Sequence, residues 1–420
     1  MNEVIVLEAE KLLKRIEKLG RFESKYTVFP CKEAASIVDG LNSLVESLPD
    51  LRNVNSRGEL VDSELKRRLV AEASRIEQRL SGRHYDFDTV IDIHGIPRKD
   101  IEELRPWLEL NRDDAFESIE RLFKTNDVES YELQLPLDVP SIRRRAQENA
   151  EDDIHRYHTT LGEMLKQLTE VGDFYSDIRA VPTEKDRSYF CPLTNTLALG
   201  IPNIYYLNED GSLGIREREL IRLYGHEGMG HGLNSMLSES DGLHYFLRKS
   251  SAVNESTLES VAQFYERVIF GDVKDSPETQ RKLDIGHKFE EIYQDAQDGN
   301  RLFDYGARLG QYAISLLGNK DLDYETRVRL LSEVSLDPNF PLGFLEYHKD
   351  SFDTQGNPNY NLVSELKYCA QPVKRALGEF EKRGISYEGE GRSLIDKAFL
   401  KGFWTPDGFV DNARLISEGK

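Results

Sequence analysis

The sequence predicts a mainly α-helical fold with one small β element, and three observations support this. Apolar residues recur at spacings of three and four through most of the 420 residues, as on the buried face of an amphipathic helix. One stretch, 194–208, is rich in β-branched, aromatic and apolar residues, which is typical of a strand. Hydrophobic residues make up 39% and charged residues 31%, so the composition is that of a globular rather than a disordered chain.

The N-terminal part of the chain is expected to be helical. Three apolar stripes occur there, each followed by a residue that ends helices: 5–19 before Gly20, 37–48 before Pro49, and 65–80 before Gly82. We interpret each stripe as a face that packs on neighbouring helices rather than as a binding surface.

A long helix at about 139–171 is predicted to lead into the β element at 194–208. Pro202 lies within that element and favours an edge strand, because proline cannot donate to a central ladder. Helical patterns resume at Ile215 and continue to about Phe403. Breaks are expected in that part of the chain at four residues: Pro277, Gly299, Gly318 and Pro341.

Charge and cysteine content exclude several classes of function. The 55 Lys and Arg against 75 Asp and Glu leave a net charge of −20, which argues against nucleic acid and against an anionic membrane surface as partners. The three cysteines, Cys31, Cys191 and Cys369, lie far apart and fit a reducing compartment rather than a disulfide scaffold. The N-terminus lacks the apolar core of a signal peptide, and no run is long enough to span a bilayer, so we expect a cytoplasmic protein.

The most informative helix covers 216–237 and contains the hexapeptide HEGMGH, from His226 to His231 with Glu227 in second place. In the common zinc-hydrolase motif HExxH, histidines four residues apart share one helix face and the glutamate activates water on the metal. Here the histidines are five apart, which places them about 140° apart around a regular helix. Both can reach one metal only if the helix contains a bulge or a widened turn.

Three glycines surround this motif: Gly225, Gly228 and Gly230. Each costs about 1 kcal/mol relative to alanine in a helix interior. A protein normally accepts such a cost for an unusual backbone or a close approach, so the glycines favour a functional site over a chance cluster.

A second helix, over 254–269, offers a third ligand. Glu255, Glu259 and Glu266 lie at spacings of four and seven and therefore share one stripe beside an apolar face. Catalytic zinc takes three protein ligands and keeps one open position, and two histidines with one glutamate form a standard set. The other carboxylates of the stripe would accept hydrogen bonds from histidine N–H groups. A solvated acidic face would explain any one of these glutamates alone, but the preceding histidine pair favours a metal.

At these residues the sequence resembles the helical gluzincin metallopeptidases. HEGMGHGLNSML is similar to the thimet-type oligopeptidase pattern HEFGHALH with one residue inserted, and LESVAQFYE at 258–266 is similar to that family's VELPSQFME. The first glutamate of that segment is the family's third zinc ligand, so the resemblance assigns this role to Glu259. The HExxGH spacing matches dipeptidyl peptidase III. The resemblance implies a mostly helical, clefted fold with zinc on the floor of the cleft.

A third likeness is to the bacterial HExxPGHH family. There a strand ending in YVN precedes the motif, as 205–208 does here, and an EGWALYAE helix follows, as 259–266 does. That family's late YPGQ segment is similar to 368–371, although the proline and second histidine of its main motif are absent here. This likeness suggests Tyr368 as the donor that stabilises the oxyanion, with Tyr305 and His348 as alternatives.

The expected site therefore holds one Zn²⁺ per chain on His226, His231 and Glu259. Its fourth position is expected to hold water whose pKa zinc lowers towards 7. Glu227 would take the proton as general base and later deliver it to the leaving amine. His244, between the two motifs, is a weaker candidate ligand.

These features predict a zinc-dependent peptidase that hydrolyses peptide bonds of oligopeptides. The catalytic helical region would cover 136–420 and the N-terminal helical region 1–135, as two domains or one continuous domain. An oligopeptide could pair with the edge of the strand at 194–208. Two alternatives stay open: a metal-dependent hydrolase of a small amide, and a helical scaffold with a vestigial site. The oligomeric state stays open as well.

Overall fold

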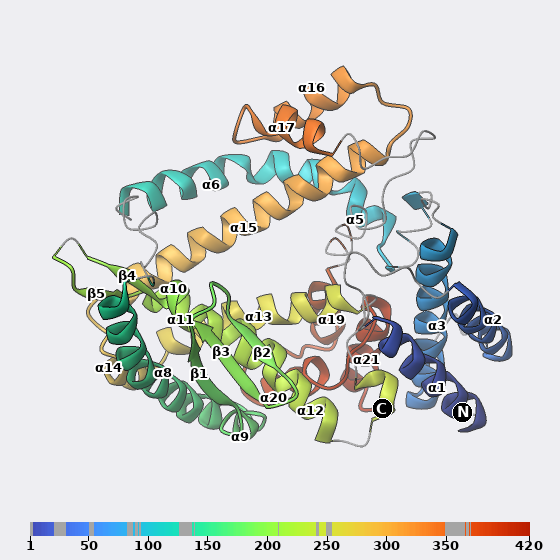
Figure 1. The fold of residues 1–420 in the computed structure, drawn as a ribbon, viewed down its shortest axis with the longest axis horizontal. Coiled ribbons are helices and arrows are strands. Elements are labelled where there is room, and N and C mark those ends of the chain that lie inside the picture. Colours follow the sequence, from blue (N-terminus) through green and yellow to red (C-terminus); the bar gives the residue numbers. More distant parts are fainter. Residues whose placement is uncertain are drawn as a thin grey trace.

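The computed structural model describes residues 3–20, 31–49, 54–81, 87–88, 91, 94–125, 137, 139–208, 210–240, 243–248, 254–348, 366, 369 and 371–420. Helices dominate these residues, and five short strands form the only sheets described there, which confirms the mainly α class with a small β element (Figure 1). None of the described helices combines the length and the apolar character that crossing a bilayer requires.

The helices before the β element are α1 Glu3–Gly20, α2 Cys31–Ser47, α3 Arg57–Ser81, α5 Arg98–Glu102, α6 Leu104–Thr125, α8 Pro140–Leu168 and α9 Gly172–Tyr175. The three N-terminal stripes form α1, α2 and α3, and the long stretch at 139–171 forms α8, as predicted. Ile37, Leu41 and Leu69 are fully buried, so the stripes face a core.

The later helices are α10 Ile201–Ile204, α11 Glu217–Leu223, α12 Asn234–Ser240, α13 Glu255–Lys274, α14 Pro277–Leu283, α15 Phe289–Gly318, α16 Tyr324–Val334, α17 Phe340–Tyr347, α19 Pro372–Glu381, α20 Gly389–Phe399 and α21 Pro406–Ser417. A π-helix, η1 Tyr224–Leu233, joins α11 to α12, and a 3₁₀ turn, η2 Tyr245–Leu247, follows.

The break predicted at Gly299 is wrong, because α15 continues through it for 30 residues. An arginine of α11, Arg218, lies beside Gly299 and donates to the carbonyl of Asp295. Packing of α15 against α6 and α11 therefore outweighs the cost of one glycine in its interior. Gly318 does end α15, and Pro277 and Pro341 lie in the first turns of α14 and α17.

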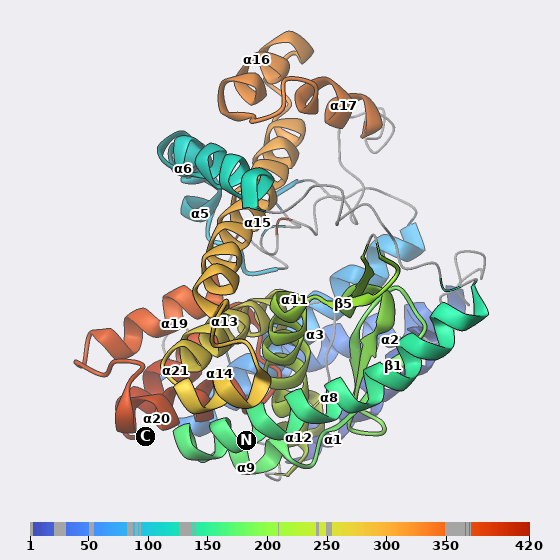
Figure 2. The same ribbon diagram turned by 90° about the vertical axis from the view of Figure 1, so that its left-hand side faces the viewer.

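Two hydrophobic cores organise the chain. The main core joins α1–α3 to α8, η1, α13 and α19–α21. The second joins α6 to α15, α16 and α17, with Leu108, Leu309 and Leu331 among its buried residues. Helix α15 runs from the main group of helices up into this second group (Figure 2). Both cores contain residues from either side of the boundary predicted at 135/136.

The β element lies between α9 and α11. Strands β1 Arg179–Thr183, β3 Thr196–Gly200 and β2 Tyr189–Cys191 form a sheet in that order, with β3 parallel to β1 and antiparallel to β2. Strands β4 Tyr205–Leu207 and β5 Leu213–Ile215 form a separate antiparallel pair.

The prediction of an edge strand over 194–208 is wrong for β3, which is the central strand of its sheet. Pro202 does not lie in the strand. It occupies the first turn of α10, where a missing N–H costs nothing, so the argument from proline does not apply to β3. The free edge nearest the HExxxH helix belongs instead to β2, which has no second partner strand among the described residues.

Candidate metal centre

The helix that carries the HExxxH motif widens at the motif itself. Regular helix α11 gives way to π-helix over η1, and α12 restores the α form. A π-helix closes its hydrogen bonds from residue i to residue i+5, so residues five apart lie above one another. His226 and His231 therefore share one side of η1, with ring centroids 5.1 Å apart. The widened turn that the spacing requires is confirmed.

Glycines let η1 approach α13 closely. A Cβ at Gly225 would lie 2.7 Å from the carbonyl oxygen of Tyr265, and one at Gly230 would lie 2.7 Å from Cβ of Ala262. Both distances are shorter than a Cβ atom can approach a neighbouring heavy atom, so only glycine fits at these positions. The two helices can therefore pack nearly backbone to backbone, which brings the histidines of η1 within reach of the carboxylates of α13.

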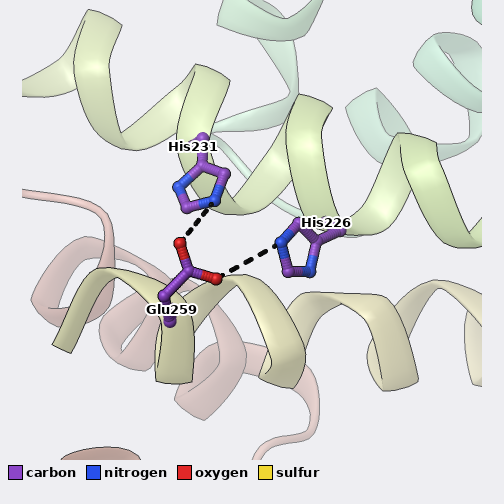
Figure 3. A group of neighbouring side chains, drawn as sticks. All are labelled: His226, His231 and Glu259. Atoms are coloured by element: carbon purple, nitrogen blue, oxygen red, sulfur yellow. Dashed lines mark ion pairs between the residues drawn. The ribbon is translucent and has the colours of Figure 1, made fainter. Parts of the chain in front are cut away.

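Glu259 lies between the two histidines (Figure 3). Its Oε2 is 3.6 Å from Nε2 of His226, and its Oε1 is 3.5 Å from Nε2 of His231. One ligand atom from each residue lies within 4.8 Å of the others. Two atoms that are each about 2.1 Å from one tetrahedral metal ion lie about 3.4 Å apart. The donor set and its spacing therefore suit zinc with one position left for another ligand.

The three side chains are only partly covered. The exposed fractions are 16% for His226, 22% for His231 and 32% for Glu259. A buried structural zinc site would be closed by protein atoms, whereas a catalytic site must stay open to substrate. This degree of exposure fits the second kind.

Glu266 completes the surroundings of His226. Its Oε2 lies 3.2 Å from Nδ1 of His226 and accepts a hydrogen bond of 3.1 Å from Arg222. Arg222 in turn donates twice to the carboxylate of Glu219, at 2.7 Å each. This series of hydrogen bonds orients the imidazole of His226 so that its Nε2 points at Glu259. Glu266 is therefore the carboxylate partner of a histidine that the acidic stripe predicts.

The two histidines hold protons very differently. Burial alone would lower the pKa of His226, but hydrogen bonds with Glu259 and Glu266 and the charge of Glu227 outweigh it and raise this pKa to about 9. Burial dominates at His231 and lowers its pKa to about 4. In the metal-free protein a proton therefore resides on His226, at the position a metal ion would take.

Glu227 lies on η1 with its carboxylate fixed by the sheet. Its Oε2 accepts a 3.1 Å hydrogen bond from the main-chain N–H of Phe190 in β2. Burial raises the pKa of Glu227, while the positive charge of His226 and the Phe190 N–H act in the opposite direction. A carboxyl group with a raised pKa is a better match for proton transfer near neutral pH.

The structure separates the remaining candidates from this site. Tyr305 is buried in the second core, where its hydroxyl donates to the carbonyl of Val334. His348 follows α17 and packs on Phe344, with ring centroids 4.5 Å apart. His244 stacks on Phe246. None of these three belongs to the described cluster around Glu259.

Three of the residues singled out in the sequence remain: Tyr368, Cys191 and Cys369. Tyr368 lies outside the described residues. Cys191 lies in β2 and Cys369 is buried, where its Sγ donates to Gln311. Neither cysteine belongs to the described metal-ligand cluster.

Two contributors are not apparent from the sequence. The N–H of Phe190 is a main-chain group, and nothing in a side-chain pattern marks it. Arg222 lies four residues before His226, one turn earlier on the same helix, and that spacing could have identified it.

A cavity of about 870 Å³ adjoins the centre. Glu259 forms part of its lining, together with residues of α13, α15 and α19. Binding sites for small molecules commonly have volumes of about 300–1,000 Å³, so the cavity is large enough to hold a ligand.

Comparison with known proteins leaves the family open. No protein-family model matches the sequence, and no curated protein matches it. A solved structure described as "the putative lipoprotein from Colwellia psychrerythraea" is 12% identical, with 97% of this chain and 70% of that chain covered and a TM-score of 0.46. A similarity at this level carries no conclusion about what this chain binds or does.

Proposed function

We propose that this protein is a zinc-dependent peptidase that hydrolyses peptide bonds of oligopeptides. The observation that carries the proposal is the π-helix, which places His226 and His231 together opposite Glu259. A long π-helix is rare and is typical of functional sites. A vestigial or accidental HExxxH would have no reason to keep this backbone.

The three side chains suit zinc chemically as well as geometrically. Two imidazole nitrogens and one carboxylate are a ligand set of catalytic zinc, and the carboxylate of Glu266 supplies the hydrogen bond that a ligating histidine normally makes. Zinc bound there would polarise a peptide carbonyl and lower the pKa of water at the open position.

Glu227 is the group placed to move the proton. Glu227 directly follows His226 on η1. The Phe190 N–H donates to one oxygen of its carboxylate, so the other oxygen can face the reacting water. Glu227 accepts a proton from that water and delivers it to the amine that leaves. Its orientation is set by main-chain geometry, which needs no reorganisation during the reaction.

Strand β2 is the element best placed to hold an extended peptide. It is an edge strand, it packs against η1, and its residue Phe190 already contacts the proposed base. A peptide that pairs with this edge would lie alongside the metal centre and would bond main-chain groups of β2 other than the Phe190 N–H, which donates to Glu227. The prediction that a peptide pairs with the strand at 194–208 does not hold for β3, because β1 and β2 flank that strand.

The test is the variant Glu227→Gln, assayed for zinc content and for cleavage of a peptide library and of small amides. We expect zinc to remain bound while peptide cleavage falls by at least a thousandfold. The control is Glu278→Gln, an exposed glutamate of α14 whose side chain is 62% exposed. Undiminished cleavage by Glu227→Gln would refute the mechanism, and cleavage of small amides alone would refute the peptide substrate.

A further inference from the structure

The cavity beside Glu259 contains an arginine that forms no ion pair within the described part of the chain. Arg308 projects from α15 and lines the cavity. Its guanidinium lies 4.3 Å from the ring centroid of Trp107, and within the described part of the chain no carboxylate forms an ion pair with it. Stacking on an indole fixes the guanidinium in place without satisfying its N–H donors.

The neighbouring arginine of the same cavity shows the contrast. Arg267 donates to both oxygens of Asp304, at 2.6 and 2.8 Å, so these two charges neutralise each other. Arg308 lies one helical turn after Asp304 and is half-buried. A partly desolvated guanidinium that lacks a paired anion is costly, and an incoming carboxylate would relieve that cost.

The rest of the lining suits an apolar chain next to that charge. Phe264, Phe303, Val373 and Leu377 provide apolar surface, and Phe303 is 58% exposed although it is a large aromatic residue. Exposed apolar side chains inside a cavity are commonly contacts for a ligand. Lys374 adds a second positive charge, at an exposed position of α19.

Negative charge in the lining is already largely compensated. Asp304 is paired with Arg267, Glu259 faces the two histidines, and Glu381 lies exposed at the end of α19. Asp304 and Asp100 attract Arg308 at longer range, but no carboxylate of the described residues pairs with it, so its N–H groups are donors that an incoming carboxylate can bind next to the apolar surface.

We propose that Arg308 binds a carboxylate of the peptide substrate while the cavity holds the apolar residues next to it. The proposal rests on the peptidase activity proposed above and deepens it, because it names the substrate end that enters the cavity. Carboxylates occur at the C-terminus of a peptide and on acidic side chains. Glu259 lines the same cavity as Arg308, so a peptide anchored at Arg308 could extend towards the metal centre.

The experiment compares three versions of one apolar peptide with the zinc-loaded full chain: a free C-terminal acid, a C-terminal amide, and the amide with glutamate at the last position. We expect the free acid to exceed the plain amide in kcat/KM by roughly ten- to a hundredfold, as for a charge-assisted hydrogen bond. If the amide that ends in glutamate is cleaved as well as the free acid, the site also binds acidic side chains. The length of the C-terminal fragment that cleavage releases reports the distance between Arg308 and the metal centre.

Arg308→Gln should remove the advantage of the acid, so that this variant cleaves the acid and the amide with equal kcat/KM. Arg308→Lys keeps the charge and should retain part of the advantage, which guards against misfolding of the first variant. The matched control is Arg329→Gln, an arginine of α16 whose side chain is 64% exposed. Equal cleavage of acid and amide by the wild type would overturn the assignment of Arg308 and leave the peptidase proposal intact.

Binding separates failure of this inference from failure of the peptidase proposal. Fluorescent acid and amide peptides are titrated into zinc-loaded Glu227→Gln and into Glu227→Gln/Arg308→Gln. Tighter binding of the acid that depends on Arg308 supports the inference even when no peptide is cleaved. Equal binding of both peptides to both proteins overturns it.

Discussion

Oε2 of Glu266 lies 3.2 Å from Nδ1 of His226, on the opposite side of the ring from Glu259. The imidazole therefore has a carboxylate at each nitrogen. Glu266 is fixed by Arg222, whereas Glu259 faces His231 as well. Because of this asymmetry, Glu266 is the residue that orients His226, and Glu259 is the residue that would bind the same metal ion as the two histidines.

The first prediction concerns Glu266→Gln. The amide oxygen can still accept from Nδ1, but it carries no charge, so His226 becomes a weaker ligand and the Arg222 pair is lost. We expect zinc affinity to fall by about 10–100-fold, measured by competition with a chromophoric chelator. Glu290→Gln on α15, with a side chain 79% exposed, is the control. Unchanged affinity in Glu266→Gln would remove Glu266 from the site.

The second prediction is the pH dependence of zinc binding. A proton on His226, with a pKa of about 9, competes with the metal, whereas His231, with a pKa of about 4, is already neutral. Apparent zinc affinity should therefore rise about tenfold per pH unit from pH 7 and level off only near pH 9. In Glu266→Gln the plateau should begin at lower pH, because one hydrogen bond that raises this pKa is weakened. A wild-type plateau that is complete by pH 7 would contradict this account.

The third prediction tests the contact of η1 with α13. Gly230→Ala places a methyl group against Ala262, so we expect the free energy of unfolding to fall by about 1–3 kcal/mol and zinc occupancy to fall with it. Urea denaturation and elemental analysis measure the two effects. Gly306→Ala is the matched control, because nothing lies within 4 Å of its new Cβ on α15. That variant should gain about 0.5–1 kcal/mol.

The sequence predicts the widened helix at the HExxxH motif better than it predicts the β element. Residue spacing alone shows that histidines five apart need a widened helix, since the requirement is geometric and local. The position of β3 in its sheet depends on β1, whose residues pair with β3 from 17 positions earlier (Arg179 with Thr196) and carry no strong strand pattern. Strand order depends on tertiary contacts. Pro202 carries information only about its own position in the chain, which lies outside β3.

The surroundings of the site were harder to predict for a related reason. Arg308, Phe303 and Lys374 reach one cavity from two helices that are far apart in sequence, and periodicity identifies buried faces but not which faces meet. The main-chain N–H of Phe190 has no side-chain signature at all. Glu259 and Glu266 could be proposed because they lie on one helical stripe close to the motif.

The fourth prediction concerns acid stability. Burial alone would raise the pKa of Asp298, but hydrogen bonds from Arg121, Gln294 and Ser118 lower it to about 2. The bonds from Ser118 and Arg121 tie α15 to α6. Because the folded pKa is below the unfolded value of about 4, the stabilisation is complete above pH 4 and is lost as the pH falls through 2.

Unfolding experiments between pH 5 and pH 2 test this directly. Asp298→Asn should be less stable than the wild type at neutral pH and should show a smaller decline over that range. Arg121→Gln removes the strongest donors to Asp298 and brings its folded pKa closer to the unfolded value, so the decline should be smaller and should end at a higher pH. Parallel pH profiles for the wild type and Asp298→Asn would show that this carboxylate does not govern acid stability.

The central claim, a zinc ion held by His226, His231 and Glu259, is tested most directly by elemental analysis of the purified protein after dialysis against buffered zinc. The account predicts one zinc ion per chain in the wild type and in Glu227→Gln, and a loss of most of that zinc in Glu259→Ala. Full zinc occupancy in Glu259→Ala, or none in the wild type, would contradict it.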